Sequence, residues 1–246
     1  MRLDKIRGFI VYSFPLGEAD QIITCFSSSG NLVKFMAKGS RKVKSRFAAP
    51  VQLFNLGEYV LYRGRGLPFL RQAEIIDSFN PIRRDWTKSG SALAAMELCR
   101  LLIGEETRED RVFQLVLAYF YNLREKYNSL AFDAFRLQFV ARLGYGMEFD
   151  HCISCGRNLD AAWVSWEAGG ALCDRCRQHG SGYVHLEKDM LQLLGKLQLM
   201  DLNEVDKVDG HQYRQQCAAV VDSLIFWLTE GKTKAQAFRK LFDSKY

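Results

Sequence analysis

The sequence predicts an α+β multidomain protein in which a small N-terminal antiparallel β-barrel is followed by an α-helical domain with an inserted zinc hairpin. Three observations lead to this fold class. The first 80 of the 246 residues alternate short β-rich runs with turns, the residues after Asn80-Pro81 follow helical spacing, and four of the seven cysteines fall between Cys152 and Cys176. We expect domains at residues 1–80 and 81–246, with a zinc-binding segment at residues 149–183.

Five strands are expected in the N-terminal part. The strands are rich in β-branched and aromatic residues, and turns containing Gly, Ser or Asn separate them. They are expected at residues 6–12, 21–26, 31–38, 59–62 and 69–76. Five short strands without a helix between them favour a small barrel or sandwich, for which the oligonucleotide-binding (OB) barrel is the natural candidate at this size. The same alternation also fits a five-stranded SH3-like barrel.

Helical periodicity dominates the rest of the chain. Apolar side chains at i, i+3, i+4 and i+7 predict helices around residues 95–103, 112–123, 132–143, 190–197, 217–228 and 235–242. Gly144 and Gly231 are placed to end two of them. The segment from residue 149 to 183 lacks this spacing and contains the clustered cysteines.

The clustered cysteines form two CxxC pairs, Cys152 with Cys155 and Cys173 with Cys176, separated by 17 residues. Two such pairs supply four thiolates, which fill a tetrahedral Zn²⁺ coordination sphere and leave no position for a catalytic water. We therefore expect one structural zinc ion, with the strand-like residues 163–166 packed over it. His151 and His179 flank the pairs and are expected outside the ligand set.

The other three cysteines, Cys25, Cys99 and Cys217, lie singly in apolar segments and are expected in the core. An odd number of cysteines suits a reducing compartment better than a disulfide framework. The N-terminus has no export signal, and the longest apolar run, residues 115–121, is far shorter than the roughly 18 residues of a membrane span. A cytoplasmic location without membrane contact is therefore expected.

Positive charge is concentrated in the first third of the chain. Residues 1–84 contain 14 Lys and Arg against 6 Asp and Glu, a net charge of +8, whereas the rest contains 20 against 22, a net charge of −2. A localised positive field attracts polyanions. Residues 34–46 contain six cations and no acidic residue, and Arg63, Arg65 and Arg71 form a second basic patch. The candidate DNA-binding residues are the cations of both groups: Lys34, Lys38, Arg41, Lys42, Lys44, Arg46, Arg63, Arg65 and Arg71.

Aromatic residues interleave with these cations. Phe35, Phe47 and Tyr62 are candidates for stacking on bases, because basic grooves with aromatic platforms are typical of single-strand binding. Two plainer interpretations stay open at this point: the aromatic residues can be core, and the basic run can be a solvated loop.

Several functions are disfavoured. The chain has no GxxxxGK[ST] motif for nucleotide phosphates and no HxE with PCxxC pattern of a zinc deaminase. A zinc-ribbon transcription or translation factor remains the alternative, although acidic residues around the cysteines balance Arg157, Arg175 and Arg177.

Several segments resemble the RecO family of bacterial DNA repair proteins. They include the run Ala37-Lys38-Gly39-Ser40-Arg41-Lys42 with Lys44-Ser45-Arg46, and the turn Gly64-Arg65-Gly66. Leu143-Gly144-Tyr145 before the first CxxC pair and the basic segment Lys234 to Lys240 are also similar.

The resemblance implies an OB domain, a helical domain with a zinc hairpin, and no catalytic centre. It implies a mediator of DNA repair and recombination in the RecF pathway that responds to DNA damage in the cytoplasm, associated with the nucleoid. Such a mediator binds single- and double-stranded DNA, anneals complementary strands, and helps load recombinase. Its implied partners are RecR and the acidic C-terminal tail of single-stranded DNA-binding protein (SSB).

Overall fold

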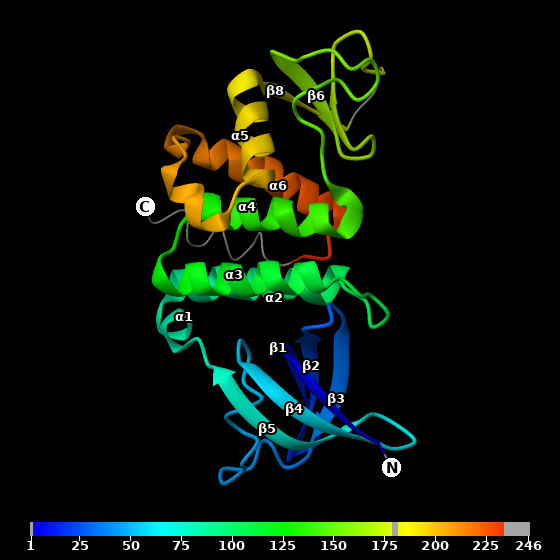
Figure 1. Ribbon diagram of the computed structural model, residues 1–246, viewed down its shortest axis with the longest axis vertical. Helices are drawn as coiled ribbons and strands as arrows, with labels where there is room; N and C mark the ends of the chain where they lie inside the picture. Colours follow the sequence, from blue (N-terminus) through cyan, green and yellow to red (C-terminus); the bar gives the residue numbers. More distant parts are fainter. Residues whose placement is uncertain (1, 179–181, 234–246) are drawn as a thin grey trace. The chain divides into compact units, whose positions relative to one another are not determined.

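A computed structural model describes residues 2–178 and 182–233 of the chain (Figure 1). Contacts divide it into two compact units, Met1–Gln114 and Leu115–Thr233, so that the division falls inside helix α3 (Asp110–Glu125). The helix expected at residues 235–242, the basic segment Lys234 to Lys240 and His179 lie outside the described residues. In the described ranges, no helix is long and apolar enough to cross a bilayer.

The five expected strands are all present. They are β1 (Arg2–Leu16), β2 (Asp20–Ser27), β3 (Leu32–Ala37), β4 (Leu56–Arg63) and β5 (Phe69–Asp77). They close into a barrel with the order β1-β2-β3-β5-β4. The expectation of a purely antiparallel barrel was wrong at one place, because β3 and β5 pair in parallel where Met36 meets Phe69.

The barrel interior follows the two-residue alternation of the strands. Ile10, Ile23, Phe35, Tyr59 and Leu61 are completely buried inside it. Phe47, from the long β3–β4 connection, joins the same core. Phe35 and Phe47 therefore hold the barrel together and are not available for stacking on bases, so for these two residues the core interpretation is confirmed.

Helices α1 (Asn80–Arg84) and α2 (Trp86–Leu102) and the start of α3 complete the first unit. α1 leads into α2, whose N-terminus is capped by the Asp85 carboxylate accepting a 2.9 Å hydrogen bond from the Lys88 amide. At the start of α3, the Phe113 ring packs against Phe9 and Phe26 with centroid separations of 5.7 and 5.6 Å.

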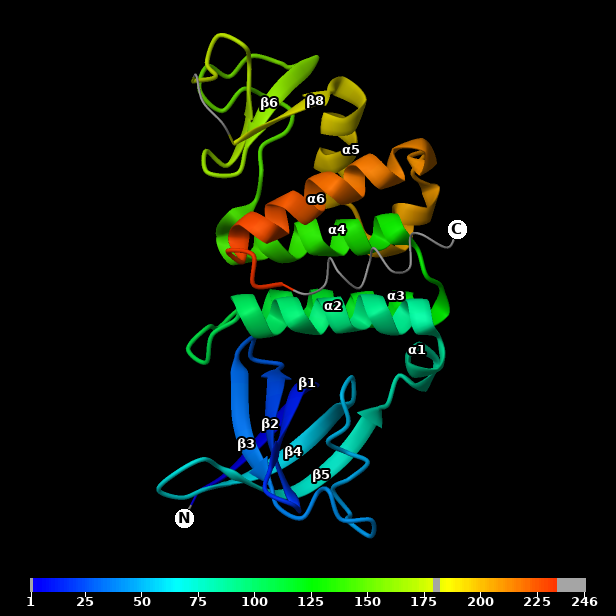
Figure 2. The same cartoon turned by 180° about the vertical axis from the view of Figure 1, so that it is seen from behind.

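The second unit is built around α4 (Ser129–Val140), which is buried over almost its whole length. α5 (Lys188–Leu199) and α6 (Arg214–Leu228) pack against it (Figure 2). The helix expected at residues 132–143 ends as predicted near Gly144, which has a left-handed φ of 93° inside a terminal π-turn, Ala141–Tyr145.

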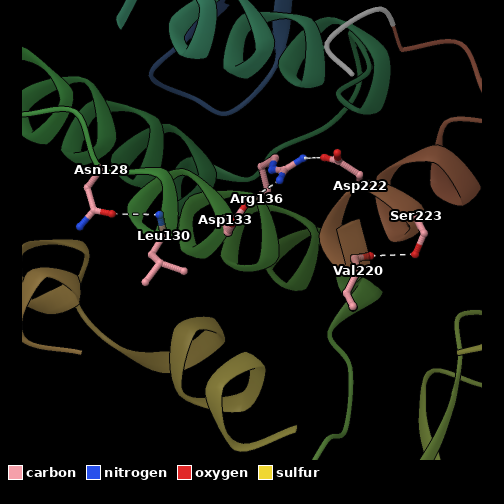
Figure 3. A network of polar contacts seen from close by, with 7 residues as sticks. All are labelled: Asn128, Leu130, Asp133, Arg136, Val220, Asp222 and Ser223. Atoms are coloured by element: carbon pink, nitrogen blue, oxygen red, sulfur yellow. Dashed lines mark hydrogen bonds and ion pairs between the residues drawn. The ribbon is translucent and has the colours of Figure 1, made fainter. Parts of the chain in front are cut away.

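A buried ion network joins α4 to α6 (Figure 3). The Arg136 guanidinium, whose side chain is only 5% exposed, pairs with Asp133 on its own helix and with Asp222 on α6. The Arg136 guanidinium also lies 4.6 Å from the centroid of the Phe132 ring. A charge this deeply buried needs such partners, because an unpaired one costs several kcal/mol.

Candidate metal centre and nucleic-acid interface

The four cysteines of the two CxxC pairs lie together. Their sulfur atoms are all within 4.8 Å of one another, and the Cys155 and Cys173 sulfurs are 3.9 Å apart. Four sulfurs about 2.3 Å from a central Zn²⁺ are separated by about 3.8 Å. This cysteine group can therefore hold one tetrahedral metal ion.

Local backbone geometry brings the sulfurs together. Gly156 takes a left-handed φ of 73°, and its amide donates a 2.8 Å hydrogen bond to the Cys152 carbonyl, which closes the first turn. The Cys176 amide closes the second turn on the Cys173 carbonyl at 3.0 Å. A side chain at position 156 would be strained in this conformation, which explains why glycine follows the first pair.

Electrostatics favour the metal-binding form of Cys152. Burial alone raises the pKa of its thiol, but hydrogen bonds from the backbone of Cys173, Cys155 and Ser154 outweigh burial and lower the pKa to about 6. The Cys173 amide lies 3.5 Å from the Cys152 sulfur. Thiolates are the ligands that zinc requires, so the lowered pKa makes Cys152 available for metal binding at neutral pH.

A small sheet with the order β7-β6-β8 packs beside the cysteines. Its strands are β6 (Ala161–Ser165), β7 (Gly170–Leu172) and β8 (Tyr183–Glu187). Leu172 packs directly on Cys152 and Cys173, with Leu159 and Tyr183 beside them. The expected strand at residues 163–166 exists as β6, but Trp163 contacts His185 and Arg177 and is not part of the cluster over the sulfurs.

Three of the candidate DNA-binding residues converge on the exterior of the barrel. The Lys38 Nζ lies 4.4 Å from the centroid of the Phe69 ring, and the Arg71 guanidinium lies 5.2 Å from that of Tyr62. The Arg46 guanidinium donates a 3.1 Å hydrogen bond to the Arg71 carbonyl. We call Lys38, Arg46, Arg71, Tyr62 and Phe69 the cation–aromatic cluster.

The β3–β4 connection carries three more cations. Arg41 donates a 2.7 Å hydrogen bond to the Gly17 carbonyl, which ties the connection to the β1–β2 turn. Lys42 and Lys44 are exposed on either side of Val43, which is also fully exposed. This segment presents its charges to solvent over the same barrel.

The remaining candidates lie apart from the cation–aromatic cluster. Lys34 pairs with Glu105 at 2.8 Å, and Arg63 pairs with Asp4 across β1 and β4. Arg65 is exposed in the β4–β5 turn. Of the candidate cations, Lys34 and Arg63 therefore already have acidic partners.

Sequence reasoning missed Phe69 and Glu105. Phe69 is the first strand residue after the Gly66-Leu67-Pro68 turn, and an aromatic side chain at such a position can point outward. Glu105 is far from Lys34 in sequence, so no local pattern could have paired the two residues.

Comparisons with known proteins agree over nearly the whole chain. Residues 1–79 match the family described as Recombination protein O N terminal, and residues 83–237 match Recombination protein O C terminal. The chain belongs to the RecO family. RecO proteins act in DNA repair, so this membership gives the chain a DNA repair and recombination role.

Individual RecO relatives are similar over 78% to 98% of the chain. A DNA repair protein RecO of Frankia casuarinae is 34% identical over 201 residues, which is 78% of this chain and 83% of the relative. The protein of that name in Syntrophomonas wolfei is 30% identical over 205 residues, covering 83% and 82%. That of Clostridium novyi is 28% identical over 247 residues, covering 98% and 96%.

Proposed function

We propose that this RecO-family chain is a non-catalytic recombination mediator of the RecF pathway. In this proposal it binds single- and double-stranded DNA in the bacterial cytoplasm, on the nucleoid, and anneals complementary strands. It helps load recombinase onto SSB-coated DNA together with RecR, and the SSB acidic tail docks on the helical domain. Family membership supports this role, and the basic barrel supports the DNA contact.

The proposed domain boundary lies after residue 80, where the sequence changes from strand-like to helical patterns. Residues 1–80 form the DNA-binding domain, and residues 81–246 form the helical domain with the metal segment at 149–183. The strand order β1-β2-β3-β5-β4, with its parallel β3–β5 pair, supports an OB barrel for the first domain. The cysteine group would hold one structural Zn²⁺, which would fix the two CxxC turns to each other beside the small sheet β7-β6-β8.

One observation carries the DNA assignment. Between residues 34 and 46 the chain has six cations and no acidic residue, and three cations of the barrel converge with two exterior aromatic rings. Cations at these positions can neutralise phosphates on one face of the barrel without reading base edges. The proposed DNA-contacting set is Lys34, Lys38, Arg41, Lys42, Lys44, Arg46, Arg63, Arg65 and Arg71.

Annealing follows from this arrangement. Two complementary strands repel each other through their phosphates, and a protein that neutralises both lowers the cost of their approach. No nucleotide is needed, because base pairing itself supplies the free energy.

The test reverses the charge of the β3–β4 connection. In the variant with Lys38, Arg41, Lys42 and Arg46 all changed to Glu, DNA affinity should fall strongly at low salt. The slope of log affinity against log salt should fall by about one for each phosphate that the protein no longer neutralises. Annealing of labelled complementary strands, with and without SSB, should slow in parallel.

The matched control is Lys196→Glu, which reverses a charge on α5 of the helical unit. It should leave affinity, salt slope and annealing close to wild type. Equal affinity of the quadruple variant and wild type would overturn the assignment of the DNA-binding face.

A further inference from the structure

A row of apolar and aromatic side chains crosses the outside of the barrel. Phe14 on β1 is paired with Ile22 on β2, Ile22 with Met36 on β3, and Met36 with Phe69 on β5. Phe69 is paired in turn with Tyr62 on β4. Paired residues point to the same face of a sheet. We call these five residues the exterior row.

The exterior row lies on the solvent side of the strands. The neighbours of its members along each strand, Ile23, Phe35, Leu61 and Leu70, are in the barrel core, and alternation therefore turns the row outward. Phe14 is 54% exposed, and none of the ring or cation contacts of the described residues involves it. Strands β1, β2 and β3 lie side by side in Figure 2, as the register requires.

Cations lie beside the exterior row. Lys38 lies over Phe69, Arg71 lies over Tyr62, and Arg46 is bonded to the Arg71 carbonyl. Arg41 is anchored at the β1–β2 turn, where its partner Gly17 follows Phe14 closely in the chain. The row is most open to solvent at Phe14, and its other four members are partly exposed. A partly exposed apolar row flanked by positive charge is complementary to a polyanion that also exposes flat apolar rings.

Single-stranded DNA is such a ligand, whereas duplex DNA keeps its bases stacked inside the helix. Four neighbouring strands, from Phe14 on β1 to Phe69 on β5, span about 14 Å at roughly 4.8 Å per strand, which is enough for more than one base. Base stacking on aromatic side chains is independent of sequence because every base has a π-face.

We propose that the exterior row, with Phe14 at its open end, is a stacking platform for the bases of single-stranded DNA. This inference rests on the proposed DNA-binding function and extends it, because the row adds a preference for single strands to a charge contact that both DNA forms share. It also explains why an apolar side chain as large as Phe14 is left exposed next to a basic loop.

The experiment compares Phe14→Ala and Phe14→Trp with wild type on three ligands: a single-stranded oligonucleotide, the same length of backbone with abasic sites, and the corresponding duplex. Phe14→Ala should bind the single strand about 5-fold to 100-fold more weakly. It should bind the abasic strand and the duplex within about twofold of wild type, because these ligands offer phosphates but no free bases. Phe14→Trp should restore single-strand affinity, and its fluorescence should be quenched by the single strand but not by the duplex.

The matched control is Ile76→Ala, which removes another exposed apolar side chain of the barrel, 44% exposed on β5 and outside the exterior row. Its affinity for all three ligands should equal that of wild type. Thermal unfolding of both alanine variants checks that the barrel stays folded.

Two outcomes would overturn the stacking platform. In the first outcome, Phe14→Ala binds the single strand as tightly as wild type, while the quadruple charge-reversal variant binds more weakly. The proposed DNA-binding function is then retained, and the row serves another contact, such as a protein partner. The other is an equal reduction of affinity for single-stranded, abasic and duplex DNA, which would mean that Phe14 does not contact bases. Failure of wild type to bind any of the three ligands would instead refute the proposed function.

Discussion

The Glu105 carboxylate holds Lys34 at 2.8 Å, so an acidic residue from the loop between α2 and α3 neutralises one cation of strand β3. The same loop is fixed to the barrel by the Leu32 amide, which donates a 3.1 Å hydrogen bond to the Gly104 carbonyl. A second hydrogen bond, 3.1 Å long, runs from the Asn31 side chain to the Glu105 carbonyl. Phosphate contact by Lys34 must therefore compete with Glu105.

Glu105→Gln should strengthen DNA binding modestly. Removing the carboxylate releases Lys34 for phosphates and removes a repulsive charge. An exposed pair of this kind contributes up to about 1 kcal/mol, so we expect affinity about two- to fivefold higher at low salt. Fluorescence anisotropy with a labelled oligonucleotide measures the affinity of each variant for DNA.

Glu106→Gln is the control for this change, because it removes the same charge one residue away and leaves the pair between Lys34 and Glu105 in place. It should change affinity by less than Glu105→Gln. If the two variants bind equally, the Glu105–Lys34 pair does not limit DNA contact.

Cys173→Ala should abolish metal binding and loosen the segment around the cysteines. Three thiolates cannot complete the tetrahedral site, and the segment loses the free energy that coordination supplies to folding. We expect zinc content to fall from about one ion per chain to none, with faster amide exchange in residues 149–183. Elemental analysis and hydrogen exchange measure the two effects.

Cys217→Ala provides the comparison, since Cys217 is a buried cysteine on α6 and not part of the four-cysteine group. It should keep full zinc content. A wild-type protein that is stably folded with no bound metal would contradict the structural role of the site.

Arg136→Met should destabilise the helical unit by about 3–5 kcal/mol. The substitution preserves much of the side-chain volume but leaves the buried Asp133 without its guanidinium partner, and breaking one half of a buried ion pair carries a penalty of this size. The free energy of unfolding in urea, followed by a probe in the helical unit, gives the value.

Lys126→Met removes half of an exposed pair, Lys126 with Asp206 at 3.0 Å, and should cost no more than about 1 kcal/mol. A similar cost for both substitutions would show that burial of the Arg136 network adds nothing.

Gly30→Ala should destabilise the barrel unit more than Gly17→Ala. Both glycines have a left-handed backbone, with φ of 78° and 61°, which costs alanine about 1–2 kcal/mol. Only at Gly30 would the new Cβ overlap the backbone of Glu109, whereas the space around Gly17 is open. Overpacking should add about 1–3 kcal/mol at Gly30, and the free energy of chemical unfolding measures it. Equal destabilisation by the two substitutions would mean that the backbone around Glu109 shifts to accommodate the new Cβ at no energetic cost.

Much of the architecture could be predicted from local patterns. The strands and most helices follow from periodicity, and Gly144 ends its helix because only a residue without a side chain takes φ of 93° easily. The 3-10 helix Leu202–Lys207 and the short helix α1 were missed, since such brief elements carry too few periodic positions. The parallel β3–β5 pair was missed because strand neighbours distant in sequence leave no local trace.

For the candidate sites too, local patterns predicted some features and long-range contacts decided others. Sequence spacing was enough to group Cys152, Cys155, Cys173 and Cys176. Each CxxC pair forms a local turn, so only one long-range contact, between the two turns, is needed to bring the four sulfurs together. Alternation could not tell which aromatic residues face outward, since the strand pattern assigns two faces without saying which is the core. Phe35 proved to be core, and Phe14 proved to be exposed.

The sequence by itself determined the barrel-then-helix order, the basic first third, the four-cysteine group and the family. These properties depend on residue type and short spacing, which the chain carries directly. Only the tertiary structure decided that Glu105 neutralises Lys34, that Arg136 is buried between two carboxylates, and that Phe14 continues into Ile22, Met36 and Phe69. Those relationships join residues far apart in the chain, so they exist only once strand register and helix packing bring the side chains together.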